Sequence, residues 1–281
     1  MRKFSRYFVL LFLLANVAFG SGHGPVFGFA TPTNPKGGWS VDTGIMGRTG
    51  SQATGLMNRT MLAYGITQDL QISVSGPAIF QTTSVAPARV TGMMPTSPDF
   101  EVLGAWRFHR SGTAVGTRFE STAYAGFIEP GPQRPPGMLG ALRRAPGYFT
   151  GIATGMASRS HYFWLGAGNT HYVERTGDQR PNTFTYSLVY GYRPKALRKD
   201  YPHWDWRGFV EMNGDVSTKA RKFDLQMPGT EGHQIFLGPS VLGIYKNYAI
   251  EGGVQVPVYR DVGSRFQPER VRFALNFSHF F

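Results

Sequence analysis

Apolar and polar residues alternate along most of the chain, and clusters of glycine, proline, asparagine and aspartate interrupt the alternation at intervals. A period of two residues is typical of β-strands with one apolar face, whereas the period of an amphipathic helix is nearly absent. We therefore expect an all-β protein. The pattern predicts twelve strands, at residues 38–47, 55–66, 69–78, 99–110, 116–128, 147–157, 160–173, 183–193, 205–214, 233–245, 248–258 and 268–281.

The predicted strands set an apolar face against a polar or small face that carries few charges. A barrel that spans lipid must turn its apolar face outward, which is the inverse of a soluble barrel. The strand at 183–193 is the clearest example, with Phe184, Tyr186, Leu188, Tyr190 and Tyr192 on one face and Thr183, Thr185, Ser187 and Gly191 on the other.

The connections alternate in length along the chain. Those after the even-numbered strands are mostly tight, such as 158–159 and 246–247, while those after the odd-numbered strands are mostly long, such as 79–98, 129–146 and 215–232. Short turns at one end and long loops at the other are typical of a bacterial outer-membrane barrel. We expect a single antiparallel transmembrane β-barrel of about twelve strands, with short periplasmic turns and long extracellular loops.

Two prolines disagree with the predicted strands. Of the 19 prolines, only Pro239 and Pro257 lie well inside them. Proline cannot donate a hydrogen bond to a strand ladder and is found mainly at edges and bulges. We expect a bulge or a shifted strand boundary at these two positions.

The composition favours strands over helices as membrane spans. Charged residues make up 16% of the chain and aromatic residues 14%, against about 25% charged residues in an ordinary soluble domain. Beyond the N-terminus no run approaches the roughly 18 to 20 apolar residues that a spanning helix requires. A secreted soluble β protein is the alternative fold.

The N-terminus has the three parts of a secretory signal peptide. Arg2, Lys3 and Arg6 precede an apolar core at 7–19, and small residues mark a cleavage site after Gly20. The alternative, a single membrane anchor, is disfavoured because the apolar run is short. We expect a protein exported to the cell outer membrane, with 1–20 as signal peptide, 21–37 as a periplasmic N-terminal segment and 38–281 as the transmembrane barrel.

The chain is strongly basic, with a formal net charge of +12 that falls to +9 when the three basic residues of the signal peptide are removed. The basic residues are spread along the chain instead of clustered on one face, so we expect no nucleic-acid partner. Outer-membrane lipid, including lipopolysaccharide, is the expected counterpart of the charge. The chain has no cysteine, which excludes disulfides and thiolate metal sites.

Charged residues on the polar faces would point into the lumen of the barrel. They could pair with one another and brace the interior, or an excess of arginine near a constriction could select anions. Both interpretations stay open at this stage. The predicted lumen residues are Asp42, Arg59, Glu101, Arg107, Arg118, Glu120, Arg207, Glu211, Glu251, Arg270 and Arg272.

Candidate sites for chemistry are few. Cleavage after Gly20 would expose Ser21-Gly22-His23, whose amine, backbone amides and imidazole could bind Cu(II) or Ni(II) in a square plane; chance placement of the histidine is the alternative. His161 and His171 share a face, but ten strand positions separate them by roughly 33 Å. No histidine and serine spacing matches a hydrolase motif. We expect no catalytic residue, no enzyme activity and no cofactor.

Two stretches carry a family resemblance. HGPVFGFATPTNPKGGWSVDTGIMGR (23–48), followed by MLAYGITQDLQISVSGP (61–77), resembles the start of a family of Gram-negative outer-membrane β-barrels, a transporter family associated with the meta-pathway of phenol degradation. The resemblance implies a porin-like passive channel or transporter for a small solute. A plugged barrel with a structural or binding role is the alternative, ahead of an outer-membrane lipid-modifying enzyme.

The chain ends on VRFALNFSHFF (271–281), an aromatic stripe where a polar tail is common. An open strand edge in lipid would leave backbone groups unsatisfied, so we expect this strand to pair with the first. Phe277, His279 and Phe281 resemble the signal by which the barrel-assembly machinery recognises its clients. His279 departs from the apolar face and is expected at the inner rim of the barrel.

Overall fold

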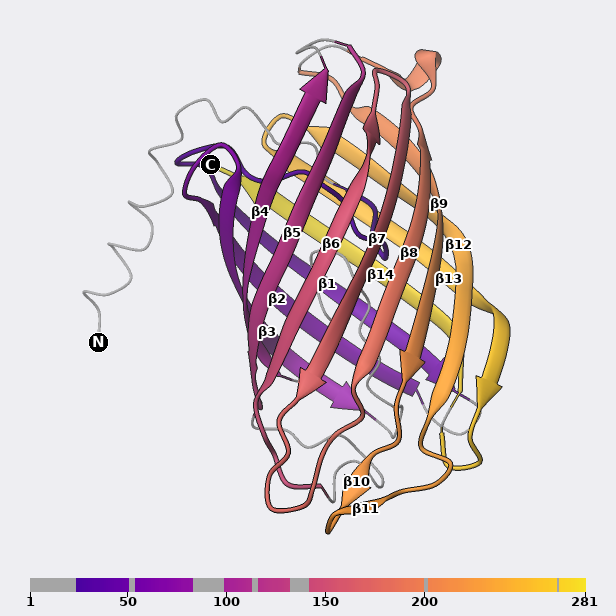
Figure 1. Cartoon of the computed structure of the whole chain (residues 1–281). Helices are drawn as coiled ribbons and strands as arrows, with labels where there is room; N and C mark the ends of the chain where they lie inside the picture. The colour runs from indigo at the N-terminus through magenta and orange to yellow at the C-terminus, as the bar shows by residue number, and fades with distance from the viewer. Residues whose placement is uncertain are drawn as a thin grey trace, which may run out of the picture.

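A computed structural model describes residues 24–50, 54–82, 99–112, 116–131, 142–199, 202–266 and 268–281. Within these residues, twelve strands close into one antiparallel barrel (Figure 1). Neighbours in the barrel follow chain order with two exceptions. Strand β9 pairs with β12 across a separate small hairpin, and β14 pairs with β1 to close the barrel.

The barrel strands are between 10 and 15 residues long. Their bounds are β1 (Trp39–Gly50), β2 (Thr54–Gly65), β3 (Leu70–Thr82), β4 (Phe100–Gly112), β5 (Arg118–Glu129), β6 (Gly147–Ala157), β7 (His161–Tyr172), β8 (Thr183–Tyr192), β9 (Asp205–Ser217), β12 (Gly232–Tyr245), β13 (Tyr248–Val262) and β14 (Glu269–Phe280). The small hairpin is β10 (Arg221–Lys222) with β11 (Leu225–Gln226), and one 3₁₀ helix, η3 (Lys195–Leu197), precedes β9. No helix in the described residues is long and apolar enough to cross a membrane.

The predicted all-β class, the single barrel and the number of its strands are confirmed. The largest differences are at the ends of β1, β3, β9 and β13, which run three or four residues further than expected toward the long loops. Backbone pairing continues there after the apolar alternation has stopped. The β10–β11 hairpin was not predicted, because strands of two residues carry no period.

The two ends of the barrel differ as the connection lengths indicated. The turns at Lys246 and at Ser158–Ser160 lie at one end, called here the short-turn end, together with Trp39 and Phe281. The longer connections and the β10–β11 hairpin lie at the opposite end, called here the loop end (Figure 1).

The last strand closes the barrel as expected. Trp39 and Phe281 exchange backbone hydrogen bonds of 2.7 and 3.0 Å, and Asp42 lies opposite Ser278 in the β1–β14 register. Closure leaves neither strand with an unpaired edge, which is the condition for a strand to stand in lipid.

Four bulges interrupt the register, and two lie at prolines. The partners of β12 skip Val258 next to Pro257, and those of β2 skip Ala78 next to Pro77. The bulge expected at Pro257 is therefore present, whereas Pro239 lies in regular register opposite Val210 of β9. The third bulge is at Phe108 of β4, where the partners of β5 pass from Arg107 to His109. The fourth, in β14, is described below because it moves a predicted lumen residue.

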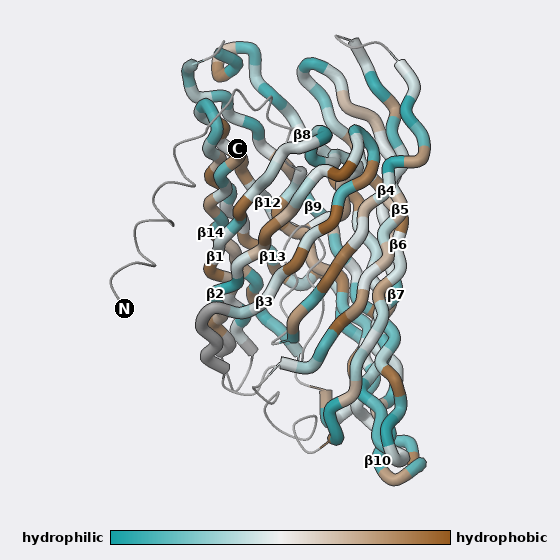
Figure 2. Tube along the Cα trace, turned by 90° about the vertical axis from the view of Figure 1, so that its left-hand side faces the viewer, coloured by the Kyte–Doolittle hydropathy of each residue, from teal (hydrophilic) through white to brown (hydrophobic). Residues whose placement is uncertain are grey.

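The outward face of the barrel is apolar and the inward face is polar. Trp106, Leu275 and Val74 are more than half exposed on the outside, while Arg59 inside the barrel is 0% exposed. In β8 five apolar residues face outward, the three threonine and serine positions are buried inside, and Val189 is an apolar residue on the inner face. Figure 2 shows hydrophobic and hydrophilic residues alternating along the strands. This inside-out arrangement is what lipid imposes on a barrel.

Candidate functional site: the barrel lumen

A stretch of chain that precedes the first strand lies inside the barrel. Residues 24–34, called here the lumen segment, contact inward side chains of β5, β7, β8 and β9 (Figure 1, indigo). They belong to the segment 21–37 that we assigned to the periplasm from the sequence. The segment therefore enters the lumen from the short-turn end, where β1 begins.

Glu211 of β9 holds one end of the lumen segment. Its carboxylate accepts three hydrogen bonds from successive backbone N–H groups, at 2.9 Å from Val26, 2.7 Å from Phe27 and 2.7 Å from Gly28. Ser240 donates a fourth hydrogen bond to the same carboxylate. Glu211 is 0% exposed, so these donors replace the water that a carboxylate would otherwise bind.

Two phenylalanines of the segment fit into gaps left by glycines in the wall. Phe29 lies over β7, where a Cβ added at Gly166 or Gly168 would overlap its ring, and it stacks on Phe149 at 6.1 Å between ring centroids. Phe27 lies against Gly253 of β13 in the same way. Glycine at these positions is explained by the close approach of the segment.

The lumen segment spans the interior from one wall to the other. Val26 and Phe27 are buried with Met46, Met57 and Met61 of β1 and β2, on the side of the barrel away from Glu211. These three methionines, whose flexible side chains fill irregular gaps, therefore form part of the wall on which the segment packs.

Further along, the segment is tied to β5 and β7. Thr122 donates a hydrogen bond of 2.7 Å to the carbonyl of Thr31, and the indole N–H of Trp164 donates one of 3.2 Å to the Thr31 hydroxyl. Tyr124 donates to the carbonyl of Ala30. Thr31 in turn donates to Glu120 at 3.2 Å. The segment is thus held by polar contacts along its length, to wall residues of several strands.

A second group of interior contacts lies toward the loop end and consists of wall side chains alone. Glu269 accepts from Arg48 at 2.8 Å and from Arg272 at 2.5 Å, and Arg272 also pairs with Asp215 at 2.6 Å. The guanidinium carbon of Arg272 lies 3.6 Å from the ring centroid of Phe236. Arg48, Glu269, Arg272 and Asp215 are all less than a tenth exposed and are called here the outer charge network.

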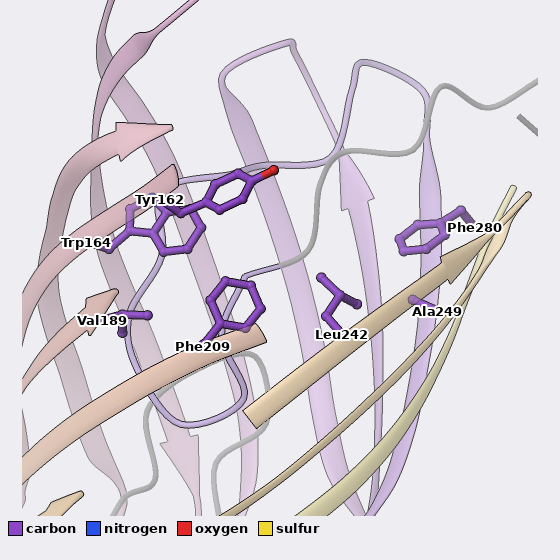
Figure 3. Close-up of a cluster of buried hydrophobic side chains, with 7 residues drawn as sticks. All are labelled: Tyr162, Trp164, Val189, Phe209, Leu242, Ala249 and Phe280. Atoms are coloured by element: carbon purple, nitrogen blue, oxygen red, sulfur yellow. The ribbon is translucent and has the colours of Figure 1, made fainter. Parts of the chain in front are cut away.

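Apolar side chains line the wall beside the segment. Seven of them come from β7, β8, β9, β12, β13 and β14 and form one buried cluster, shown in Figure 3. The cluster includes Phe209 and Leu242, and Trp164 connects it to the lumen segment. The lumen is therefore apolar on one side and charged at its loop end.

The structure places most of the predicted lumen residues on the inner face. Asp42, Arg59, Glu101, Glu120, Glu211, Glu251 and Arg272 are buried there. Arg107 and Arg207 lie inside near the short-turn end, where Arg107 pairs with Asp69 at 2.8 Å and Arg207 with Asp205 at 3.1 Å. Arg118 is half-buried. Arg107 also pairs with Glu120 at 3.5 Å, whereas the partners of Arg207 and Arg272 are acidic residues outside the predicted set.

Arg270 departs from the expected placement. The partners of β1 pass from Val271 to Glu269, so Arg270 is the extra residue of a bulge and its side chain is exposed. A bulge shifts the face of every residue beyond it. Glu269, which strict alternation places outside, is consequently buried and takes part in the outer charge network.

Several residues of the lumen were not predicted from the sequence. Asp215 lay one position past the predicted end of β9, although it continues the alternation of Arg207 and Glu211 and was detectable on that basis. The contacts of the lumen segment had no such signal, because the segment itself is not periodic.

Two polar residues tie the loops together at the loop end. Asp178 accepts hydrogen bonds from the backbone N–H groups of Arg143 at 3.0 Å and Phe223 at 3.1 Å, and so joins three connections. Burial acts to raise the pKa of Asp178, but these hydrogen bonds and nearby positive charges outweigh it and lower the pKa below its ordinary value. Arg180 pairs with Asp99 at 2.7 Å and lies over the ring of Tyr172.

The structure offers little for metal binding or catalysis. Ser21 and His23 of the predicted metal site lie outside the described residues. Among the described residues, no group of three or more histidine, cysteine, aspartate or glutamate side chains could hold a metal ion. His161 and His171 are exposed on the outer face of β7, at opposite ends of the strand.

The comparisons with known proteins concern the fold. The chain matches no protein-family model, and no curated protein matches its sequence. Among solved structures, an outer-membrane channel from Pseudomonas putida F1 is similar with a TM-score of 0.67 at 11% sequence identity, covering 92% of this chain and 100% of that chain. The NanC porin is similar with a TM-score of 0.51 at 10% identity, covering 85% of this chain and 98% of that chain. The chain therefore shares the barrel architecture of these two proteins over most of its length.

Proposed function

We propose that this protein is an outer-membrane channel for a small solute, and that the lumen segment closes the channel in the described conformation. The apolar outer face and the closed strand ladder suit a lipid bilayer. The similar solved structures are an outer-membrane channel and a porin, which supports the same class of function.

One observation carries the proposal. The interior between β2 and β9 is occupied by chain that belongs to no strand, and not by wall side chains meeting each other. Removing this chain would break no strand pairing, because its hydrogen bonds go to side chains of the wall. It would open a path beside Glu211 and the glycine positions that now accommodate Phe27 and Phe29.

A plugged barrel with a binding or structural role is the second candidate. Phe209, Phe236 and Leu242 are at most 4% exposed inside the barrel, so the packed interior is tight with the segment in place. If the segment never leaves, the barrel conducts nothing and its outer loops become the functional surface.

The proposal also includes the family, the route of export and the partners of the protein. The quoted family resemblance covers residues 23–48 and 61–77, and the first stretch includes the lumen segment and nearly all of β1. We therefore propose membership of the transporter family associated with phenol degradation. We also propose export through a signal peptide, lipopolysaccharide at the outer loops, and recognition of Phe277, His279 and Phe281 by the barrel-assembly machinery. In support of that recognition, His279 stacks on Tyr248 at 4.6 Å near the closing seam.

Planar-bilayer recording tests the channel. Refolded full-length protein should be closed for most of the time, and a variant lacking residues 24–34 should give a steady conductance. Absence of conductance in both proteins, with the β-structure intact by circular dichroism, would remove the channel and favour the plugged barrel. A full-length protein that is open all the time would remove the closing role of the segment.

A further inference from the structure

An apolar groove lies in the outer wall near the short-turn end. It has a volume of about 400 Å³ and runs over β8, β9 and β12, a size within the usual range of ligand sites. Its floor is Gly208 of β9, which lies between Tyr192 of β8 and Val241 of β12 in the strand register. A Cβ added at Gly208 would meet no atom within 4 Å, so the hollow is open to the outside.

The groove is bordered by an aromatic shelf. Trp206 covers Gly243 of β12 and stacks on Trp204 at 5.3 Å, and Trp204 stacks on Tyr245 at 5.3 Å. Rings of this kind gather at the level where lipid head groups begin. The groove therefore extends from the head-group level into the apolar part of the bilayer.

The connection that ends the groove is basic. Residues 193–204 read RPKALRKDYPHW, with four basic residues and one acidic residue. Leu197 of η3 lines the groove and is 48% exposed. Lys195 and Arg198 lie on either side of Leu197 in the chain. An exposed leucine between two cations suits a lipid with an apolar chain and a negative head group, and it has no evident purpose in water.

We propose that this groove binds an anionic glycerophospholipid of the periplasmic leaflet, with one acyl chain over Gly208 and the phosphate beside Lys195 and Arg198. The leaflet follows from the position of the groove at the short-turn end, which faces the periplasm in barrels of this class. The inference rests on the proposed location of the barrel in the outer membrane and is independent of whether the channel conducts.

Native mass spectrometry of the full-length folded protein tests the site. With equal amounts of phosphatidylglycerol and phosphatidylcholine in mixed micelles, we expect about fivefold more phosphatidylglycerol to be retained. Gly208→Leu, which fills the hollow, should lower retention of phosphatidylglycerol about tenfold. Lys195→Gln should lower it about fivefold and leave phosphatidylcholine unchanged.

Two matched controls separate the site from general effects. Gly104→Leu places the same side chain on the outer face of β4, where a Cβ has room, and Lys36→Gln removes an exposed charge at the same end of the barrel. Neither should change retention. Equal retention by the wild type and Gly208→Leu would overturn the proposal. So would a dimer that Gly208→Leu dissociates, because a second copy of the chain would then be the occupant. A barrel that retains the lipid and conducts nothing would remove the channel and leave this site.

Discussion

The two halves of the barrel interior are filled in different ways. From the short-turn end to the middle, the lumen segment fills the space and is held by wall groups such as Glu211 and Thr122. Toward the loop end, side chains of three strands meet directly in the outer charge network, centred on Glu269 and Arg272. The first half is filled by the lumen segment, which belongs to no strand, and the second is lined by paired side chains of the wall itself.

This difference separates gating from stability. Three of the donors to Glu211 are backbone N–H groups outside any strand, so breaking these three contacts need not disturb the barrel. The charges of the outer network belong to β1, β9 and β14, so breaking them leaves an unpaired charge in the wall. Mutations in the two halves should therefore be measured by different experiments.

The largest expected effect is loss of stability when the outer charge network is cut. Arg272→Ala leaves Glu269 and Asp215 buried without their shared partner and should lower the free energy of unfolding by about 4 kcal/mol. Urea unfolding in detergent measures this change. Arg270→Ala, at the exposed bulge position two residues away, is the matched control and should cost less than about 0.5 kcal/mol. Similar losses for the two variants would contradict a special role for the network.

The next largest effect is on channel opening. Glu211→Ala removes the acceptor of three backbone N–H groups and should raise the open probability about a hundredfold, equivalent to about 3 kcal/mol weaker seating of the lumen segment. Single-channel recording measures it. Ser187→Ala removes one neutral hydrogen bond to Phe29 and should have an effect of about fivefold. If Arg272→Ala opened the channel as much as Glu211→Ala, the distinction between the two halves would fail.

A smaller effect is expected from the aromatic contacts of the segment. Phe29→Leu keeps an apolar side chain but loses the stacking on Phe149 and the contact with Tyr124, so opening should rise about fivefold. Phe163→Leu makes the same change on the outer face of β7 and should leave opening unchanged. An equal effect of both variants would place the cause in the wall and not in the segment.

The smallest effect concerns the loops. The pKa of Asp178 is lowered in the folded protein, so its stabilising contribution is present above the ordinary aspartate pKa and is lost as the pH falls through the lowered value. Asp178→Asn should therefore speed amide exchange in the loop of Phe223 about fivefold at neutral pH. The difference between wild type and variant should shrink in acid. If the difference in amide exchange between wild type and variant grew as the pH fell, the lowered pKa of Asp178 would be contradicted.

The fold was predictable because lipid imposes a strict rule on the sequence. A strand that faces lipid on one side must alternate, and β8 does so at every position except Val189, which is apolar on the inner face. The rule fails locally at Arg270, where an extra residue reverses the faces and no sequence signal marks the bulge.

The candidate site was only partly predictable. Glu211 was identified as a lumen residue by its parity, but its partners were not, because Val26 lies 185 residues away in a stretch without alternation. The glycines opposite Phe27 and Phe29 are equally uninformative alone, since glycine is common throughout the chain, with 36 in total.

The central claim is that the lumen segment closes the channel, and a disulfide tests it most directly. The chain has no cysteine, and a Cβ built at Gly28 lies 3.5 Å from the Cβ of Ser187, within the range of disulfide geometry. Gly28→Cys with Ser187→Cys would lock the segment to β8, with Val189→Ala to relieve the overlap at Gly28.

The measurement is single-channel recording of this locked protein before and after a reductant is added to the same bilayer, with the Val189→Ala protein as control. We expect no openings in the oxidised state and openings like those of the control after reduction. Openings of the same size before reduction, or none after it, would contradict closure by the lumen segment.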